Sequence, residues 1–92
     1  MNITEEDRVQ YNLIEDINNS KIIGTASTII EYLNDMIEYN LNNTDDELSI
    51  KDIKKTIGYI EYALKENIDE NTIIAIFENP MCGLDWQIVD YC

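Results

Sequence analysis

Three carboxylates recur at helical spacing near the middle of the chain: Glu31, Asp35 and Glu38. Apolar residues recur between them, so residues 29–41 are predicted to form a helix with one apolar face and one acidic face. Carboxylates one helical turn apart lie about 5–6 Å from each other, close to the ~7 Å between successive phosphates of DNA. Such a row would fit among the Arg and Lys side chains of a nucleic-acid-binding groove. The alternative is an exposed face that only keeps the protein in solution.

Two further features accompany this row of carboxylates. Tyr32 and Tyr39 flank the acidic face of the same predicted helix, and tyrosine is a frequent anchor in binding surfaces. An acidic loop after the helix extends the negative charge. The candidate protein-binding residues are therefore Glu31, Tyr32, Asp35, Glu38, Tyr39, Asp45, Asp46 and Glu47.

The residue types needed for most catalytic sites are missing. None of the 92 residues is a histidine, which excludes Ser-His-Asp and Cys-His sites and removes the usual general base at neutral pH. The three glycines, at positions 24, 58 and 83, are too scattered for a phosphate-binding loop. Paired carboxylates hydrolyse glycosides in some enzymes, but a chain this short leaves little room for the necessary cleft. We therefore expect no enzymatic activity and no cofactor.

The loop after the acidic helix has a superficial likeness to a calcium-binding loop. Asn42, Thr44 and Asp46 alternate along it. It lacks the glycine that such loops have at their sixth position, and Ile53 stands where the twelfth position requires glutamate. A solvated acidic turn is the better interpretation, and no metal site is predicted.

Two cysteines, Cys82 and Cys92, lie near the C-terminal end. They are too few for a structural zinc site in a chain without histidine, and thiols stay reduced in the cytosol. Two unpaired thiols and a single disulfide between them are the open alternatives.

The composition is strongly acidic. Nineteen Asp and Glu residues against six Lys and Arg residues give a formal net charge of −13. Residues 1–48 carry −9, residues 49–66 carry +1 and residues 67–92 carry −5. Such a chain repels nucleic acid and anionic membranes and is attracted to cationic surfaces. No secretion signal is visible, and no apolar run reaches the roughly 20 residues of a membrane span, so we expect a cytoplasmic protein.

The first predicted helix begins at the N-terminal end of the chain. Thr4 precedes three acidic residues, as in a capped first turn. The apolar spacing of Val9, Leu13 and Ile17 extends this helix to residues 18–20.

Two longer helices are predicted to follow. The second begins near Ser20 or near Ser27, where Thr28 and Glu31 have the spacing of a capping box. The third follows a cap at Ser49. Its apolar stripe consists of Ile50, Ile53, Ile57, Ile60 and Leu64, and the opposite side carries Tyr59 and Tyr62. Either another element covers these two tyrosines, or they form an interface patch.

Two interpretations fit the secondary structure of the C-terminal third. Residues 70–78 are predicted as a short fourth helix capped by Asp69, although the β-branched residues within 72–77 also suit a strand. Residues 84–91 combine the alternation of a strand with the spacing of a short helix, so both stay open. We predict one all-α domain over residues 1–92, a compact bundle of about four helices with a short C-terminal strand pair as an alternative.

A small acidic helical chain without catalytic residues resembles the phage-encoded anti-CRISPR and anti-restriction proteins that act as nucleic-acid mimics. The resemblance covers the size, charge and predicted helicity of the whole chain. It implies a stoichiometric inhibitor that binds the basic groove of a nucleic-acid-binding protein, such as a nuclease or a CRISPR effector, without binding nucleic acid itself. One alternative is an immunity protein against a nuclease toxin. Another is an assembly module that forms a homodimer through Tyr59 and Tyr62.

Overall fold

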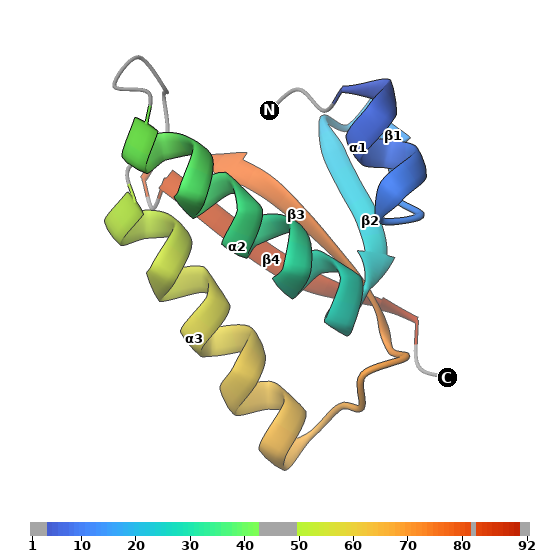
Figure 1. The fold of residues 1–92 in the computed structure, drawn as a ribbon. Coiled ribbons are helices and arrows are strands. Elements are labelled where there is room, and N and C mark those ends of the chain that lie inside the picture. Colours follow the sequence, from blue (N-terminus) through green and yellow to red (C-terminus); the bar gives the residue numbers. More distant parts are fainter. Residues whose placement is uncertain (1–3, 43–49, 82, 91–92) are drawn as a thin grey trace.

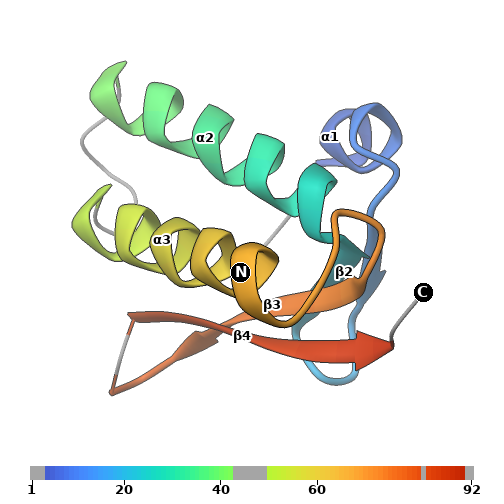
Figure 2. The ribbon, with the colours of Figure 1, turned by 90° about the horizontal axis from the view of Figure 1, so that it is seen from below.

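The computed structural model describes residues 4–42, 50–81 and 83–90. A four-stranded antiparallel sheet forms one layer, and two long antiparallel helices cover one of its faces (Figures 1 and 2). The helices are α1 (Glu5–Gln10), α2 (Ala26–Asn42) and α3 (Ile50–Glu66). The strands are β1 (Ile14–Asp16), β2 (Lys21–Thr25), β3 (Ile73–Asn79) and β4 (Gly83–Asp90), and their order in the sheet follows the chain.

The prediction of an all-α bundle of four helices is therefore wrong. The predicted fourth helix is strand β3, which pairs with β2 on one side and with β4 on the other. Three consecutive residues of β3, Ile74, Ala75 and Ile76, are fully buried. Such a continuous apolar run does not alternate as in a half-exposed strand, and periodicity alone does not distinguish it from a buried helix.

Asp69 begins a turn rather than a helix. The Asn71 amide donates to the Asp69 carboxylate at 2.8 Å, and the Thr72 amide donates to the Asp69 carbonyl at 3.1 Å. The Thr72 hydroxyl in turn accepts from the Asp69 amide at 3.1 Å. Through these bonds Asp69 stabilises a local turn. An aspartate side chain can form such a turn or cap a helix, so its presence alone does not distinguish the two.

The first helix is much shorter than predicted. Its N-terminal cap is confirmed, because the Asp7 amide donates to the Thr4 hydroxyl at 3.1 Å. The helix ends at Gln10, and Asn12 then takes a left-handed conformation with φ of 53°. After this change of direction Ile14 belongs to strand β1, where it pairs with Ile23.

The other predictions of secondary structure fare better. Helix α2 begins at Ala26, close to the later of the two predicted starts. The predicted capping box of Thr28 and Glu31 is wrong, because Thr28 lies inside the helix and its amide donates to the hydroxyl of the cap Thr25 at 3.2 Å. Helix α3 is confirmed from Ile50, while the predicted cap Ser49 lies outside the described residues. The C-terminal segment forms strand β4, which is one of the two structures left open by the sequence.

The core lies between the sheet and the two long helices. Thr56 ties these layers together, because its buried hydroxyl donates to the Leu84 carbonyl at 3.1 Å. The largest fully buried apolar side chains are Ile22, Ile74 and Ile76 from the sheet, Ile29 and Leu33 from α2, and Ile53 and Ile60 from α3.

No helix of the described residues covers the second face of the sheet (Figure 2). Strand register places Ile14, Ile23, Ala75 and Phe77 on this face. Lys21 reaches over it, with its ammonium group 5.2 Å from the centre of the Phe77 ring, an arrangement that favours a cation–π interaction. None of the helices in the described part of the chain is long and apolar enough to cross a bilayer.

Two glycines provide a matched test of this packing. A Cβ at Gly24 would lie 2.5 Å from Cδ2 of Leu13 and 3.0 Å from the Thr28 hydroxyl, whereas a Cβ at Gly58 would meet nothing within 4 Å. We predict that Gly24→Ala lowers the free energy of unfolding by about 1–3 kcal/mol through overpacking. Gly58→Ala should raise it by about 0.5–1 kcal/mol, because alanine favours a helix interior. Urea denaturation of dilute protein measures both, and a loss for Gly58→Ala as large as that for Gly24→Ala would contradict the fold.

Candidate protein-binding surface

The acidic row of α2 is exposed along the outer side of the helix. Glu31, Asp35 and Glu38 are all exposed, as the sequence predicts. Ile29 and Leu33, from the opposite side of the helix, are fully buried in the core. The core therefore fixes the rotation of α2, and with it the direction in which the three carboxylates point.

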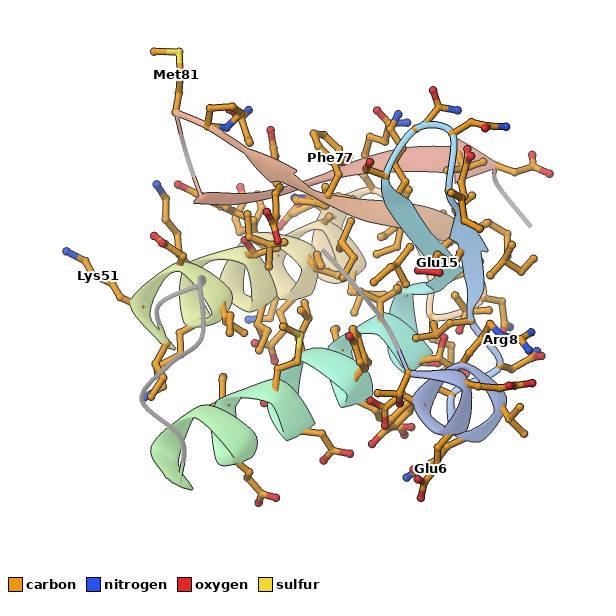
Figure 3. All side chains as sticks on the ribbon, turned by 90° about the horizontal axis from the view of Figure 1, so that it is seen from above. Glu6, Arg8, Glu15, Lys51, Phe77 and Met81 are labelled. Carbon is orange, nitrogen blue, oxygen red and sulfur yellow. The ribbon has the colours of Figure 1, made fainter. Side chains whose placement is uncertain are left out.

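The fold places two further carboxylates near Tyr32, in the N-terminal half of α2. Asp7 of α1 and Glu15 of β1 lie close enough to Tyr32 for their charges to raise its pKa. Glu15 pairs with Ile22, whose side chain belongs to the core, so Glu15 is on the face of the sheet that α2 covers. Figure 3 shows Glu15 on this side of the sheet and Glu6 of α1 pointing away from the sheet. We name Asp7, Glu15, Glu31, Asp35 and Glu38 the acidic surface.

Sequence reasoning missed Asp7 and Glu15. The first was interpreted only as part of the first turn of a helix, and the second was placed within a helix that ends earlier. Nothing in their local sequence indicates that α1 and β1 pack beside α2. Only the pairing of β1 with β2, which leads directly into α2, makes them neighbours of the acidic row.

Tyr32 holds these elements together rather than lying at the surface. It is only 4% exposed, and its ring packs against that of Tyr11 with the centroids 5.8 Å apart and the planes tilted by 59°. Such tilted aromatic pairs are favourable. This position differs from the predicted role of Tyr32 as a binding anchor, because its ring is already covered within the chain.

The other predicted binding residues are only partly placed. Tyr39 belongs to α2, but its side chain is outside the described set. Asp45, Asp46 and Glu47 lie outside the described residues altogether. Their part in the binding surface stays a prediction. In the part of the chain that the structure describes, no group of three or more potential ligands could hold a metal ion.

Helix α3 presents a second and chemically different surface. Tyr59 is 55% exposed and Tyr62 is 65% exposed, so of the two alternatives for these residues the structure has the exposed one. The ammonium group of Lys55 lies 5.8 Å from the centre of the Tyr59 ring. Helix α3 contains four lysines, whereas the sequence of α2 contains no basic residue.

The protonation state of Tyr32 tests the packing around the acidic surface. Burial, reinforced by the charges of Asp7 and Glu15, raises the pKa of Tyr32 to about 12. An unfolded tyrosine ionises near pH 10. The stability that neutral Tyr32 contributes is therefore fully present below about pH 10 and is lost as the pH rises through about 12.

We predict that Tyr32→Phe removes this part of the alkaline loss. Between about pH 9 and pH 12 the free energy of unfolding of the native chain should fall by about 2 kcal/mol more than that of the variant. Urea titrations at several pH values measure the difference, with Tyr59→Phe as an exposed control that should follow the native chain. Equal alkaline losses in the native chain and Tyr32→Phe would show that Tyr32 is not buried among these acids.

Comparison of the chain with protein-family models, curated proteins and solved structures finds no match. The function is therefore inferred from the surfaces themselves. Among the described residues, the row Glu31, Asp35 and Glu38 places three exposed carboxylates on a helix whose other side is buried in the core.

Proposed function

We propose that the protein is a stoichiometric inhibitor that binds the basic groove of a nucleic-acid-binding protein and takes the place of the nucleic acid there. The observation that supports this proposal is the row of exposed carboxylates Glu31, Asp35 and Glu38 on α2, a helix that also has Asp7 of α1 and Glu15 of β1 near its Tyr32. The target is a cytoplasmic protein such as a nuclease or a CRISPR effector. The proposal assigns no catalytic residue, no cofactor and no direct contact with nucleic acid or membrane.

Rigidity is what makes the acidic surface suited to mimicry. A helix holds carboxylates one turn apart at about 5–6 Å. The buried residues of α2 hold this helix against the core, so the backbone positions from which the three carboxylates extend are set before binding. A preorganised surface loses less conformational entropy on association than a disordered acidic segment does.

Charge and short-range contacts have separate roles in this mechanism. The net charge of −13 attracts a cationic groove over long distances and raises the association rate. Dissociation depends on close contacts at the interface. Tyr32 does not supply them, because it is buried. Tyr39 and the residues 45–47 therefore remain the proposed sources of contact beside the carboxylates.

Charge reversal on α2 tests the proposal. We predict that the triple variant Glu31→Lys, Asp35→Lys, Glu38→Lys slows association with the target at least about tenfold at low salt and weakens the dependence of the rate on salt. Candidate targets are basic DNA- and RNA-binding proteins, including CRISPR effectors, restriction enzymes and nuclease toxins. Stopped-flow or surface-based kinetics measure the rate, and competition with a nucleic acid measures whether the two ligands exclude each other.

A matched control separates position from net charge. The variant Glu61→Lys, Glu70→Lys, Asp90→Lys changes the net charge by the same amount at exposed residues outside the acidic surface. It should lower the association rate much less than the α2 variant does. Equal effects of both variants would show that α2 is not the contact surface, and simultaneous binding of the target to this protein and to nucleic acid would contradict mimicry.

A further inference from the structure

A row of four exposed residues runs along one side of α3: Lys55, Tyr59, Tyr62 and Glu66. Their spacing of four, three and four residues is the spacing of the seam between two helices of a coiled coil. At 100° per residue this row lies opposite the stripe of Ile53, Ile57 and Ile60 that α3 buries in the core. In Figure 1, α2 lies along one side of α3 and no described element lies along the other. We name these four residues the α3 seam.

The α3 seam is complementary to itself when two copies of the helix run antiparallel. A two-fold axis between Ile60 and Glu61 places Lys55 opposite Glu66 of the partner subunit and Tyr59 opposite Tyr62 of the partner subunit. The two-fold rotation generates each of these contacts twice. The seam, about 16 Å long, therefore has an ion pair at each end and two aromatic contacts at its centre. The order positive, aromatic, aromatic, negative is what an isologous antiparallel contact requires.

Gly58 lies where a partner side chain would enter. In a coiled coil, a knob fits into a hole made by residues i, i+3, i+4 and i+7. Around the α3 seam this hole is formed by Lys55, Gly58, Tyr59 and Tyr62. A Cβ at Gly58 would meet nothing within 4 Å, so the hole has an open floor that accepts a tyrosine ring. This contact would explain why a glycine stands in the middle of α3. At such a position glycine otherwise lowers the stability of the helix.

The charge distribution favours this face for contact between two copies. Residues 49–66 carry a net charge of +1, whereas the whole chain carries −13. Two copies that meet through α3 therefore bring together their least repulsive elements and keep the carboxylates of α2 apart. A dimer in which the α2 helices of the two copies contacted each other would place carboxylates against carboxylates.

We propose that the chain forms a homodimer in which the α3 helices of two copies pack antiparallel, with the two-fold axis between Ile60 and Glu61. The contact involves one helix from each subunit, so it is small and reversible, at the weak end of specific interfaces. The dimer leaves the α2 helices on its two flanks, where their acidic surfaces are exposed. This inference does not rest on the proposed function, because it uses the α3 seam and the charge distribution of the chain and no property of a target.

A charge swap tests both the contact and its register. Sedimentation equilibrium of the full chain over a range of concentrations measures the dimer dissociation constant. Lys55→Glu alone and Glu66→Lys alone should each weaken the dimer about tenfold, because each places like charges opposite one another at both ends of the seam. The double variant Lys55→Glu, Glu66→Lys restores opposite charges and should return the constant to within about threefold of the native value.

Further variants serve as controls. Lys54→Glu makes the same charge change next to the seam and should weaken the dimer much less than Lys55→Glu does. Tyr59→Ser with Tyr62→Ser should abolish the dimer. All these residues are exposed, so circular dichroism and urea denaturation should show an unchanged fold. Because screening reduces the repulsion between two acidic subunits, moderate salt should strengthen the dimer, the opposite of its effect on a cationic target.

Three results would overturn the proposal. One is a monomer at every concentration of the native chain. Another is a dimer that Lys55→Glu and the double tyrosine variant leave unchanged. The third is a dimer lost on Ile14→Asp in the uncovered face of the sheet but retained in the tyrosine variant, which would place the interface on the sheet.

Discussion

The antiparallel pairing of β2 with β3 is the constraint on which the rest of the structure depends. It joins the N-terminal and C-terminal hairpins into one sheet, with Ile22 opposite Ile76 and Gly24 opposite Ile74. The two helices between these strands must then cross one face of the sheet together. Their buried residues meet those of β2 and β3 in a single core. Close packing across this layer requires a glycine at position 24, where the side chain of Leu13 occupies the space of a Cβ.

This constraint also creates the two exposed surfaces. Because β2 leads directly into α2, the β1 strand and the α1 helix lie beside the N-terminal half of α2, and Asp7 and Glu15 lie near Tyr32. Tyr11 and Tyr32 fill the space between these elements. Helix α3 covers β4 at the other side of the sheet and carries the lysines and the exposed tyrosines. The chain thus separates a strongly acidic side from a nearly neutral aromatic side, and each side suits a different contact.

The sequence predicted the two helices whose apolar and polar residues lie on separate faces. It did not predict the strand in which consecutive residues are buried. The long helices α2 and α3 have clear apolar stripes, and the exposure of Glu31, Asp35 and Glu38 followed from them. In strand β3 the consecutive residues Ile74, Ala75 and Ile76 are all buried. The apolar run therefore has neither a helical nor an alternating period, and Asp69 suggested a cap where it forms a turn. The apolar residues after Gln10 matched a helical spacing by chance. Tyr32 lay beside the acidic row on a helical wheel, and only the packing of α1 and β1 against α2 accounts for its burial.

The pairing of β2 with β3 is also the feature that most directly separates this fold from a helical bundle. Nuclear Overhauser effects between backbone protons measure it in solution without any substitution. The account predicts cross-strand contacts between Ile22 and Ile76 and between Gly24 and Ile74, together with extended-chain patterns through residues 73–79. Contacts between residues three apart throughout 70–78, without any contact to residues 21–25, would contradict it and would remove the support for both surfaces.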